Sequence, residues 1–285
     1  MVEETDRRGG DEVAIFTQVH PGQHVGRRGA DITDGTELLR PGDLLTPSRV
    51  GSIAALGIAK IEVYARPRVA LLSTGNEIIA PGQPLGPGQI YDINRFTLGS
   101  VVREHGGVPV AFPTTGDNLD ELSAAVDACL EHDILVFSGG SSVGERDLTL
   151  DVMQRNGKIL FHGIAVKPGR PTAFGTIGSI PVLGMPGYPT SCLSNAYILL
   201  VPVLRRLARL PVYRFRTVSV PASQKFVSTT NRHQFYTVRV VDGLAVPAFK
   251  ASGDITSMSQ ADGYIEIPAQ TELVEEGETV EVKLF

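Results

Sequence analysis

The sequence has few cysteines, no long apolar run and no excess of positive charge, and each shortage excludes a class of protein. Its two cysteines, Cys129 and Cys192, stand far apart and not at metal-ligand spacing, so we expect small core residues in a reducing compartment. No apolar run could cross a bilayer, and the charged first residues lack the apolar middle of a signal peptide. The net charge of −5 gives no general attraction for nucleic acid or an anionic membrane. The sequence therefore predicts a cytoplasmic protein that binds neither.

The sequence contains enough apolar material for two ordinary domains and a fragment of a third. It has 285 residues, of which 42% are hydrophobic and 20% are charged. Residues 1–66, rich in Gly, Pro and polar turns with one short helix leading into a strand, predict a β-rich remnant of larger N-terminal domains. Residues 67–210 predict a three-layer α/β/α domain with a mostly parallel sheet, closed by one long helix over 193–209. Residues 211–285 alternate apolar and polar residues, which predicts a small C-terminal all-β, barrel-like domain.

Three of the predicted strands are followed by glycine-containing loops that each carry a carboxylate, Glu77, Asp117 or Asp147. Ligands of open α/β sheets bind beyond the carboxyl ends of the strands, so we expect these acids to meet at one rim. The third loop, which begins at Gly139, offers backbone N–H groups to phosphate, and acids beside phosphate are typical of a Mg²⁺ site. Each acid also has a plainer interpretation. Glu77 could be a solvated loop acid, Asp117 could cap the helix that follows Asn118, and Asp147 could favour a helix N-terminus.

Cationic and rigid segments follow later in the chain. Lys167 and Arg170 flank a Pro-Gly turn in "VKPGRPTAFG" and would grip a phosphorylated, anionic ligand. The segment "GMPGYPTS", residues 184–191, stands at another strand end, where its prolines stiffen the turn. Thr190 or Ser191 is expected to cap the helix that it opens and to present amides to an anion.

In this order, the motifs "STGNE", "GQIYDINR", "GGSSVGERD", "KPGRPTAFG", "GMPGYPTS" and "SGDITSMSQADGYIEIP" resemble the molybdopterin molybdenumtransferase family, which includes MoeA and the E domain of gephyrin. The resemblance implies that molybdate is inserted into adenylylated molybdopterin in a Mg²⁺-dependent step with release of AMP. It also implies a homodimer and contact with the molybdopterin adenylyltransferase.

The positions of these motifs imply which residues of this chain correspond to the family's site. Asp147, Glu77 and Asp117 resemble its catalytic and metal-binding acids, and Asp31 in "RRGADITDG" resembles a further catalytic acid. The residues expected to bind the pterin nucleotide and molybdate are Thr74, Gly75, Gly139, Gly140, Ser141, Ser142, Gly144, Glu145, Lys167, Gly169, Arg170, Pro186, Gly187, Pro189 and Ser191.

The chain departs from the family at particular places. Tyr188 stands where the family often has Asn, and the usual N-terminal Asp-Gly-aromatic-Ala and Met-Thr-Gly-Ala-Pro motifs are absent, so we interpret the chain as N-terminally shortened. That shortening favours one alternative, a non-catalytic carrier or scaffold for molybdopterin or the finished cofactor. Another alternative is the adenylyltransferase, which shares the α/β domain. Its Gly-Gly-Thr-Gly loop is replaced here by Ser141-Ser142, and it lacks the C-terminal β domain.

Overall fold

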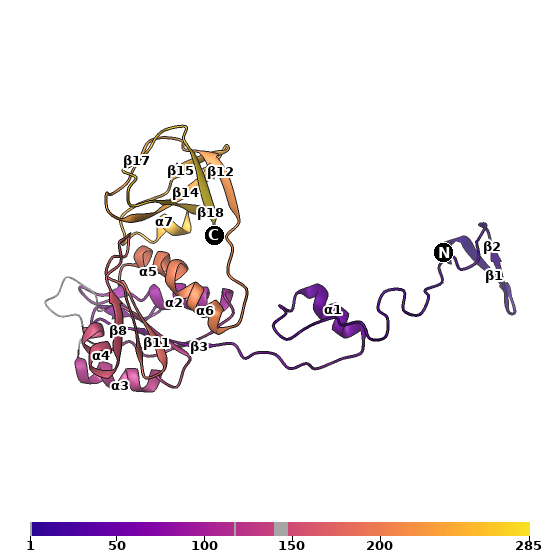
Figure 1. Ribbon diagram of the computed structural model, residues 1–285, viewed down its shortest axis with the longest axis horizontal. Helices are drawn as coiled ribbons and strands as arrows, with labels where there is room; N and C mark the ends of the chain where they lie inside the picture. The colour runs from indigo at the N-terminus through magenta and orange to yellow at the C-terminus, as the bar shows by residue number, and fades with distance from the viewer. Residues whose placement is uncertain (1, 117, 140–147) are drawn as a thin grey trace. The chain divides into compact units, whose positions relative to one another are not determined.

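The computed structural model describes residues 2–116, 118–139 and 148–285. These form two compact units, Met1–Ile61 and Glu62–Phe285, whose elements are labelled in Figure 1.

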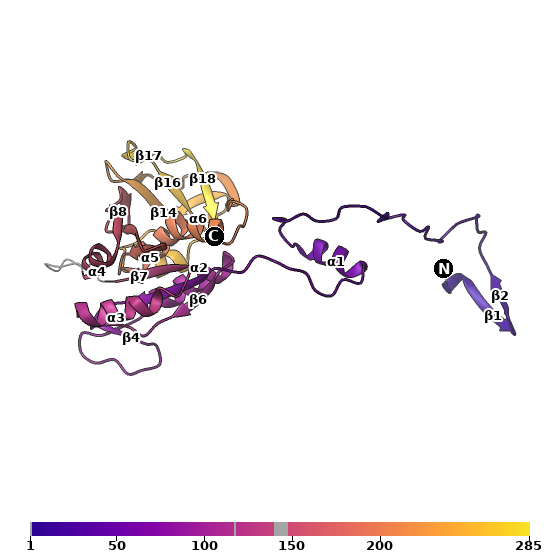
Figure 2. The ribbon, with the colours of Figure 1, turned by 60° about the horizontal axis from the view of Figure 1, so that its bottom comes forward.

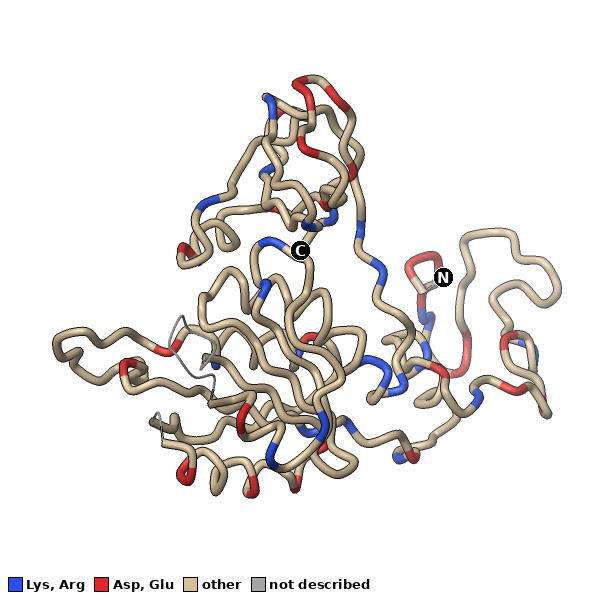
Figure 3. Tube along the Cα trace, turned by 60° about the vertical axis from the view of Figure 1, so that its left-hand side comes forward, with Lys and Arg blue, Asp and Glu red and all other residues tan. Residues whose placement is uncertain are grey.

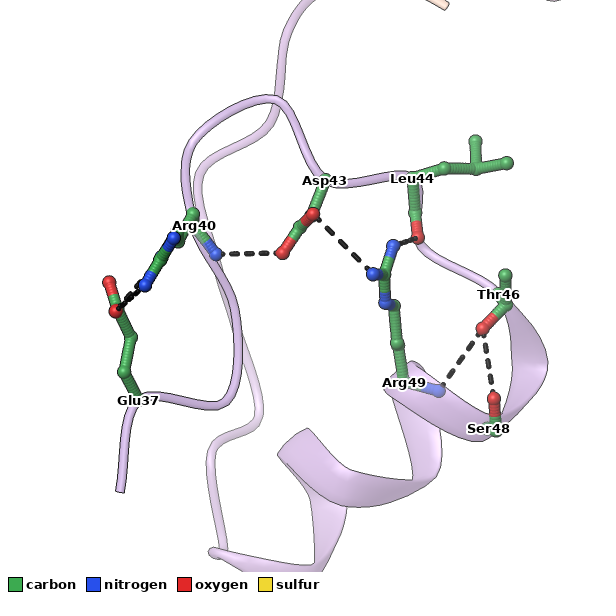
Figure 4. Close-up of polar contacts among 7 residues, drawn as sticks. All are labelled: Glu37, Arg40, Asp43, Leu44, Thr46, Ser48 and Arg49. Atoms are coloured by element: carbon green, nitrogen blue, oxygen red, sulfur yellow. Dashed lines mark hydrogen bonds and ion pairs between the residues drawn. The ribbon is translucent and has the colours of Figure 1, made fainter. Parts of the chain in front are cut away.

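The unit Met1–Ile61 contains little regular structure. Its elements are η1 (Val2–Glu4), the antiparallel strands β1 (Thr5–Gly9) and β2 (Glu12–Ile15), and the helix α1 (Pro47–Ala55). The helix begins where it does because the Thr46 side chain accepts the N–H of Arg49 and proline occupies the first turn (Figure 4). Arg49 also pairs with Asp43 at 3.4 Å and donates to the Leu44 carbonyl at 2.8 Å. None of this unit's described residues is buried, as expected for a segment without its own core. The strand expected after α1 is wrong, because residues 58–64 are irregular.

A six-stranded sheet lies at the centre of the α/β part of the second unit. Its strands are β3 (Arg68–Ser73), β6 (Val108–Ala111), β7 (Ile134–Ser138), β8 (Lys158–His162), β10 (Ala173–Ile177) and β11 (Ile180–Met185). They lie in the order β6-β3-β7-β11-β10-β8, with three parallel pairs followed by two antiparallel pairs. β7 is buried along its whole length, as is typical of a parallel strand covered on both faces.

Helices cover both faces of this sheet. They are α2 (Asn94–Glu104), α3 (Leu119–Cys129), α4 (Leu148–Asn156), α5 (Pro189–Asn195), the π-helical η2 (Ala196–Leu200) and α6 (Val201–Leu207). Val69 and Leu71 of β3 pack with α2 and the α5–α6 segment, whereas Ala70 and Leu72 pack with α3 and α4. Figure 2 accordingly shows α3 and α5 on opposite sides of β7. The prediction of one long helix over 193–209 is wrong in detail, because a π-helical turn interrupts the α-helix.

The C-terminal part is an antiparallel β structure. Its main strands are β12 (Thr217–Pro221), β14 (His233–Val241), β15 (Leu244–Pro247), β16 (Gly263–Ile267) and β18 (Thr279–Leu284), in the order β12-β18-β16-β14-β15. The shorter elements are β13 (Phe226–Val227), β17 (Leu273–Val274) and the helix α7 (Thr256–Ser259). A bridge between Ala222 and Ala245 brings the two edge strands together, which makes the sheet barrel-like.

A strand pairing and an aromatic cluster help to join the β part to the α/β part. The short strand β9 (Val166–Lys167) leaves the α/β part and pairs in parallel with the start of β14. In addition, the buried Phe235 and Tyr264 rings pack against Tyr197 and Ile198 of the π-helical turn. The β part therefore lies against the α5–α6 side of the sheet, away from α3 (Figures 1 and 2).

The predicted fold class is confirmed: a mixed α/β structure with a mostly parallel sheet and a β-rich C-terminal region. Both cysteines are free and buried, as the sequence predicts. Basic and acidic residues are interspersed along the trace of each unit (Figure 3). Within the described residues, no helix has the length and apolar character that crossing a membrane requires.

Candidate functional site

The loops that follow the parallel strands meet at one rim of the sheet. The Thr74 N–H donates to the Ser138 carbonyl at 3.0 Å, and the Gly75 N–H donates to the Thr115 carbonyl at 3.1 Å. Thr74 and Thr115 also form a parallel bridge, so the loops after β3 and β6 are paired directly. Both threonine hydroxyls are buried and have no hydrogen-bond partner among the described residues.

Glycine allows the backbones of neighbouring loops to come close at this rim. Gly139 follows β7 with φ +104°, and a Cβ atom there would collide with the Thr74 carbonyl oxygen. A Cβ placed on Gly187, in the turn after β11, would lie 3.5 Å from the Cα atom of Gly139. The strand-end loops of β6, β3, β7 and β11 therefore stand in a row at one edge.

Glu77 is the only one of the three predicted metal ligands among the described residues. It is exposed, and its carboxylate folds back over Gly75, where both oxygens would lie 2.8 Å from an added Cβ. Asp117, Asp147 and the loop residues Gly140, Ser141, Ser142, Gly144 and Glu145 lie outside the described residues. Within the described ranges, no three His, Cys, Asp or Glu side chains are grouped to hold a metal ion.

The Lys167–Arg170 turn is fixed between the α/β part and the β part. The Lys167 Nζ atom donates to Thr229 Oγ1 at 2.5 Å. Asn195, which is fully buried in α5, donates its amide hydrogens to the Gly169 carbonyl at 2.8 Å and to Thr172 Oγ1 at 2.6 Å. Arg170 is exposed, so its guanidinium is accessible to an anion.

The segment 184–191 differs in one respect from the expectation. The N-cap of α5 is Tyr188, which makes no side-chain capping bond, so neither Thr190 nor Ser191 caps this helix. Thr190 instead binds the C-terminal part. Its N–H donates to the Ser252 carbonyl at 3.1 Å and its hydroxyl donates to the Asp254 carbonyl at 3.0 Å. Ser191 is buried beside it.

Three residues of the motif "GQIYDINR" support the rim, although no role was predicted for any of them. The Asn94 side chain donates to the Gly187 carbonyl at 2.8 Å. The buried Asp92 carboxylate pairs with Arg95 at 3.3 Å, and Arg95 also reaches the Thr114 hydroxyl at 3.3 Å. These contacts connect the start of α2 to the loops after β6 and β11. The signal in the sequence was that Asp92, Asn94 and Arg95, all polar, stand together where helix α2 begins.

One small cavity lies next to the rim, and one groove lies next to the cationic turn. A cavity of about 10 Å³, enough for one water molecule, lies among Gly139, Thr149, His162, Pro171 and Met185. A groove of about 470 Å³ lies on the β part, and its lining comprises Lys225, Val227, Ser228, Thr229, Thr230, Glu272 and Leu273. Because Thr229 accepts the hydrogen bond from Lys167, this groove borders the cationic turn.

Comparison with known proteins identifies this arrangement. Residues 1–57 match the MoeA N-terminal region (domain I and II), residues 70–206 match a probable molybdopterin binding domain, and residues 219–285 match the MoeA C-terminal region (domain IV). A molybdopterin molybdenumtransferase 2 from Mycobacterium tuberculosis is 35% identical over 99% of this chain and 72% of that relative. The chain belongs to the molybdopterin molybdenumtransferase (MoeA) family.

Other members agree with this assignment. A molybdopterin molybdenumtransferase from Haemophilus influenzae is 32% identical over 96% of this chain and 70% of its own length. The crystal structure of a molybdopterin biosynthesis MoeA protein from Pyrococcus horikosii superimposes with a TM-score of 0.81 at 40% identity, over 99% of this chain and 70% of that one. The resemblance stated from the motifs is therefore confirmed.

The predicted site residues of this MoeA-family chain that the structure describes fall into three groups. The rim contains Thr74, Gly75, Glu77, Gly139, Pro186, Gly187, Pro189 and Ser191. Lys167, Gly169 and Arg170 form the cationic turn beside the β part. Asp31 is exposed and belongs to the other unit, Met1–Ile61, so its part in the site stays a prediction.

Proposed function

We propose that this chain is a molybdopterin molybdenumtransferase, which inserts molybdate into adenylylated molybdopterin with release of AMP during molybdenum cofactor biosynthesis. The proposal rests on one observation in particular. The loops after four parallel strands meet at a single rim in a chain that belongs to the MoeA family. Such a rim offers backbone N–H groups and hydroxyls to an anionic substrate.

The cationic turn supplies the charge that this substrate needs. Lys167 is held by a hydrogen bond to Thr229, and Arg170 is exposed at the other end of the same turn. Both cations balance phosphate or molybdate charge, and the planar Arg170 guanidinium can bind two oxygens at once. The match of residues 219–285 to the MoeA C-terminal region argues against the adenylyltransferase alternative.

Mg²⁺ belongs to the proposal as well. Glu77, Asp117 and Asp147 are all oxygen donors, which suits Mg²⁺, and the described member of the set has an exposed carboxylate at the rim. When bound there, Mg²⁺ would neutralise negative charge on the phosphoanhydride of the substrate. The rim and the cationic turn would orient the two substrates and offset the repulsion between their negative charges.

The test is release of AMP from adenylylated molybdopterin in the presence of Mg²⁺ and molybdate. We expect release by the wild-type chain and at least a 100-fold slower rate in Asp147→Ala and Glu77→Gln, in keeping with the loss of charge-stabilising groups. Asp127→Ala, which changes an exposed acid of α3, is the matched control and should not alter the rate. Tight binding of the substrate by the wild-type chain without any AMP release would support a carrier instead.

We also propose a homodimer that works in the cytoplasm, with the molybdopterin adenylyltransferase as a contact. Exposed apolar side chains in the unit Met1–Ile61 support self-association, among them Val13, Ile15 and Phe16, each more than half exposed. Light scattering of the full chain tests the dimer. We expect twice the monomer mass for the wild type and a shift towards monomer in Phe16→Asp, and a monomer at all concentrations would refute it.

A further inference from the structure

Tyr188 is an exposed aromatic ring on a turn whose backbone is otherwise fixed. Its side chain is 66% exposed, whereas Pro186 before it and Thr190 after it are buried. Asn94 holds the carbonyl of the preceding Gly187, and the N–H of Cys192 donates to the Tyr188 carbonyl at 2.9 Å. Because these bonds fix the backbone that carries the ring, little backbone freedom is lost when a ligand covers it.

One side of this ring is covered and the rest is free. A Cβ placed on Gly253 would lie 3.7 Å from the Cδ1 atom and 3.9 Å from the Cε1 atom of Tyr188, so the C-terminal segment passes along one edge. That segment is itself tied to the turn by the hydrogen bonds from Thr190 to Ser252 and Asp254. These distances are ordinary van der Waals contacts, and most of the Tyr188 surface faces solvent.

The ring also stands beside the rim on which the proposed anion site is built. Gly187, its chain neighbour, approaches Gly139 closely enough that a Cβ on Gly187 would lie 3.5 Å from the Gly139 Cα atom. Backbone N–H groups for an anion and an exposed aromatic ring therefore occur within one turn of each other. This pairing suits a ligand that joins a phosphate to a flat heteroaromatic ring.

We propose that Tyr188 is a specificity-determining residue that stacks on a heteroaromatic ring of the substrate, either the pterin or the adenine. The inference rests on the proposed function, because that function supplies a substrate with both rings. Stacking of this kind contributes equally to the ground state and the transition state, so its loss should raise KM and leave kcat nearly unchanged.

Two fluorescent probes separate the two rings: 6-carboxypterin for the pterin and etheno-AMP for the adenine. Titration of the full chain should show that Tyr188→Phe binds both as the wild type does, because the ring is kept. Tyr188→Leu should bind at least one of them about tenfold more weakly. The probe that loses affinity identifies the stacked ring. Tyr64→Leu is the matched control, since that half-exposed ring packs under Arg209 at 4.3 Å, and it should change neither titration.

The outcomes distinguish this inference from the proposed function. Unchanged binding of both probes by Tyr188→Leu, or no binding of either by the wild type, overturns the stacking role. AMP release with an unaltered KM in Tyr188→Leu also overturns it, while leaving the transferase intact. Ring-dependent binding without any AMP release leaves the stacking role standing and refutes the transferase. Because Tyr188 is exposed, the variants should keep the wild-type melting temperature.

Discussion

Replacement of Asn195 by alanine should loosen the cationic turn and destabilise the unit that carries it. The side chain is fully buried and donates two hydrogen bonds, to the Gly169 carbonyl and to Thr172 Oγ1. Its own amide oxygen has no partner among the described residues, so the loss of that oxygen leaves no other group unpaired. Two buried bonds at about 1 kcal/mol each give a loss of about 2 kcal/mol in the free energy of unfolding.

The matching assay is thermal or urea unfolding together with steady-state kinetics. For a unit of this size, about 2 kcal/mol corresponds to a fall of about 4–8 °C in Tm. Because Lys167 and Arg170 flank the same turn, kcat/KM should fall about tenfold. The control is Asn156→Ala, which removes one half-buried bond of 3.3 Å to Ser123 and should cost less than about 1 kcal/mol. An Asn195→Ala protein no less stable than this control would refute the reasoning.

Three further outcomes are expected. Gly139→Ala should lower the free energy of unfolding by more than about 2 kcal/mol in urea titrations, because φ is +104° and the new methyl group would collide with the Thr74 carbonyl. Gly178→Ala is the control: its methyl group enters open space, so it should cost only about 1 kcal/mol. Burial, aided by the Arg205 charge and opposed by that of Glu104, lowers the pKa of His105 from its usual 6.5. The unfolded chain then binds a proton that the folded chain rejects, so stability is lost as the pH falls below about 6.5, and His105→Phe should flatten that slope in unfolding curves from pH 5 to 8; an unchanged slope would contradict this account. Burial raises the pKa of the Cys129 thiol to about 12 and, together with a nearby carboxylate, raises that of Cys192 further, so mass spectrometry after iodoacetamide should find both cysteines labelled only in the unfolded chain.

Local patterns in the sequence were sufficient for the architecture of the α/β part. Apolar runs such as 69–72 and 134–137 are buried on both sides and became parallel strands. Asn118, which stands directly before α3, caps this helix by accepting the N–H groups of Asp120 and Glu121. The Asp242-Gly243 turn joins β14 to β15 with positive φ at both residues. Each of these features depends on residues close together in the chain.

Contacts between distant segments could not be predicted in the same way. The hydrogen bond from Lys167 to Thr229 spans 62 positions, and the sequence around either residue does not indicate that the other is its partner. The contact of Thr190 with Asp254 spans 64 positions and replaces the capping role expected from the local pattern. Asn195 follows Thr190, Ser191 and Ser194 in a helix that already contains several polar residues, so nothing local marks it out, and its partners depend on how the turn at Gly169 packs.

The pairing of β9 with β14 has a mechanical consequence. Val166 and Lys167 are covalently part of the α/β region and yet are hydrogen-bonded as a strand of the barrel-like region. A hinge motion between the two regions would have to separate β9 from β14 and break the hydrogen bond from the His233 N–H to the Ala165 carbonyl. Opening and closing of these two regions around a substrate would therefore have to break this pairing. Slow amide exchange at His233 would be the direct sign of this rigidity.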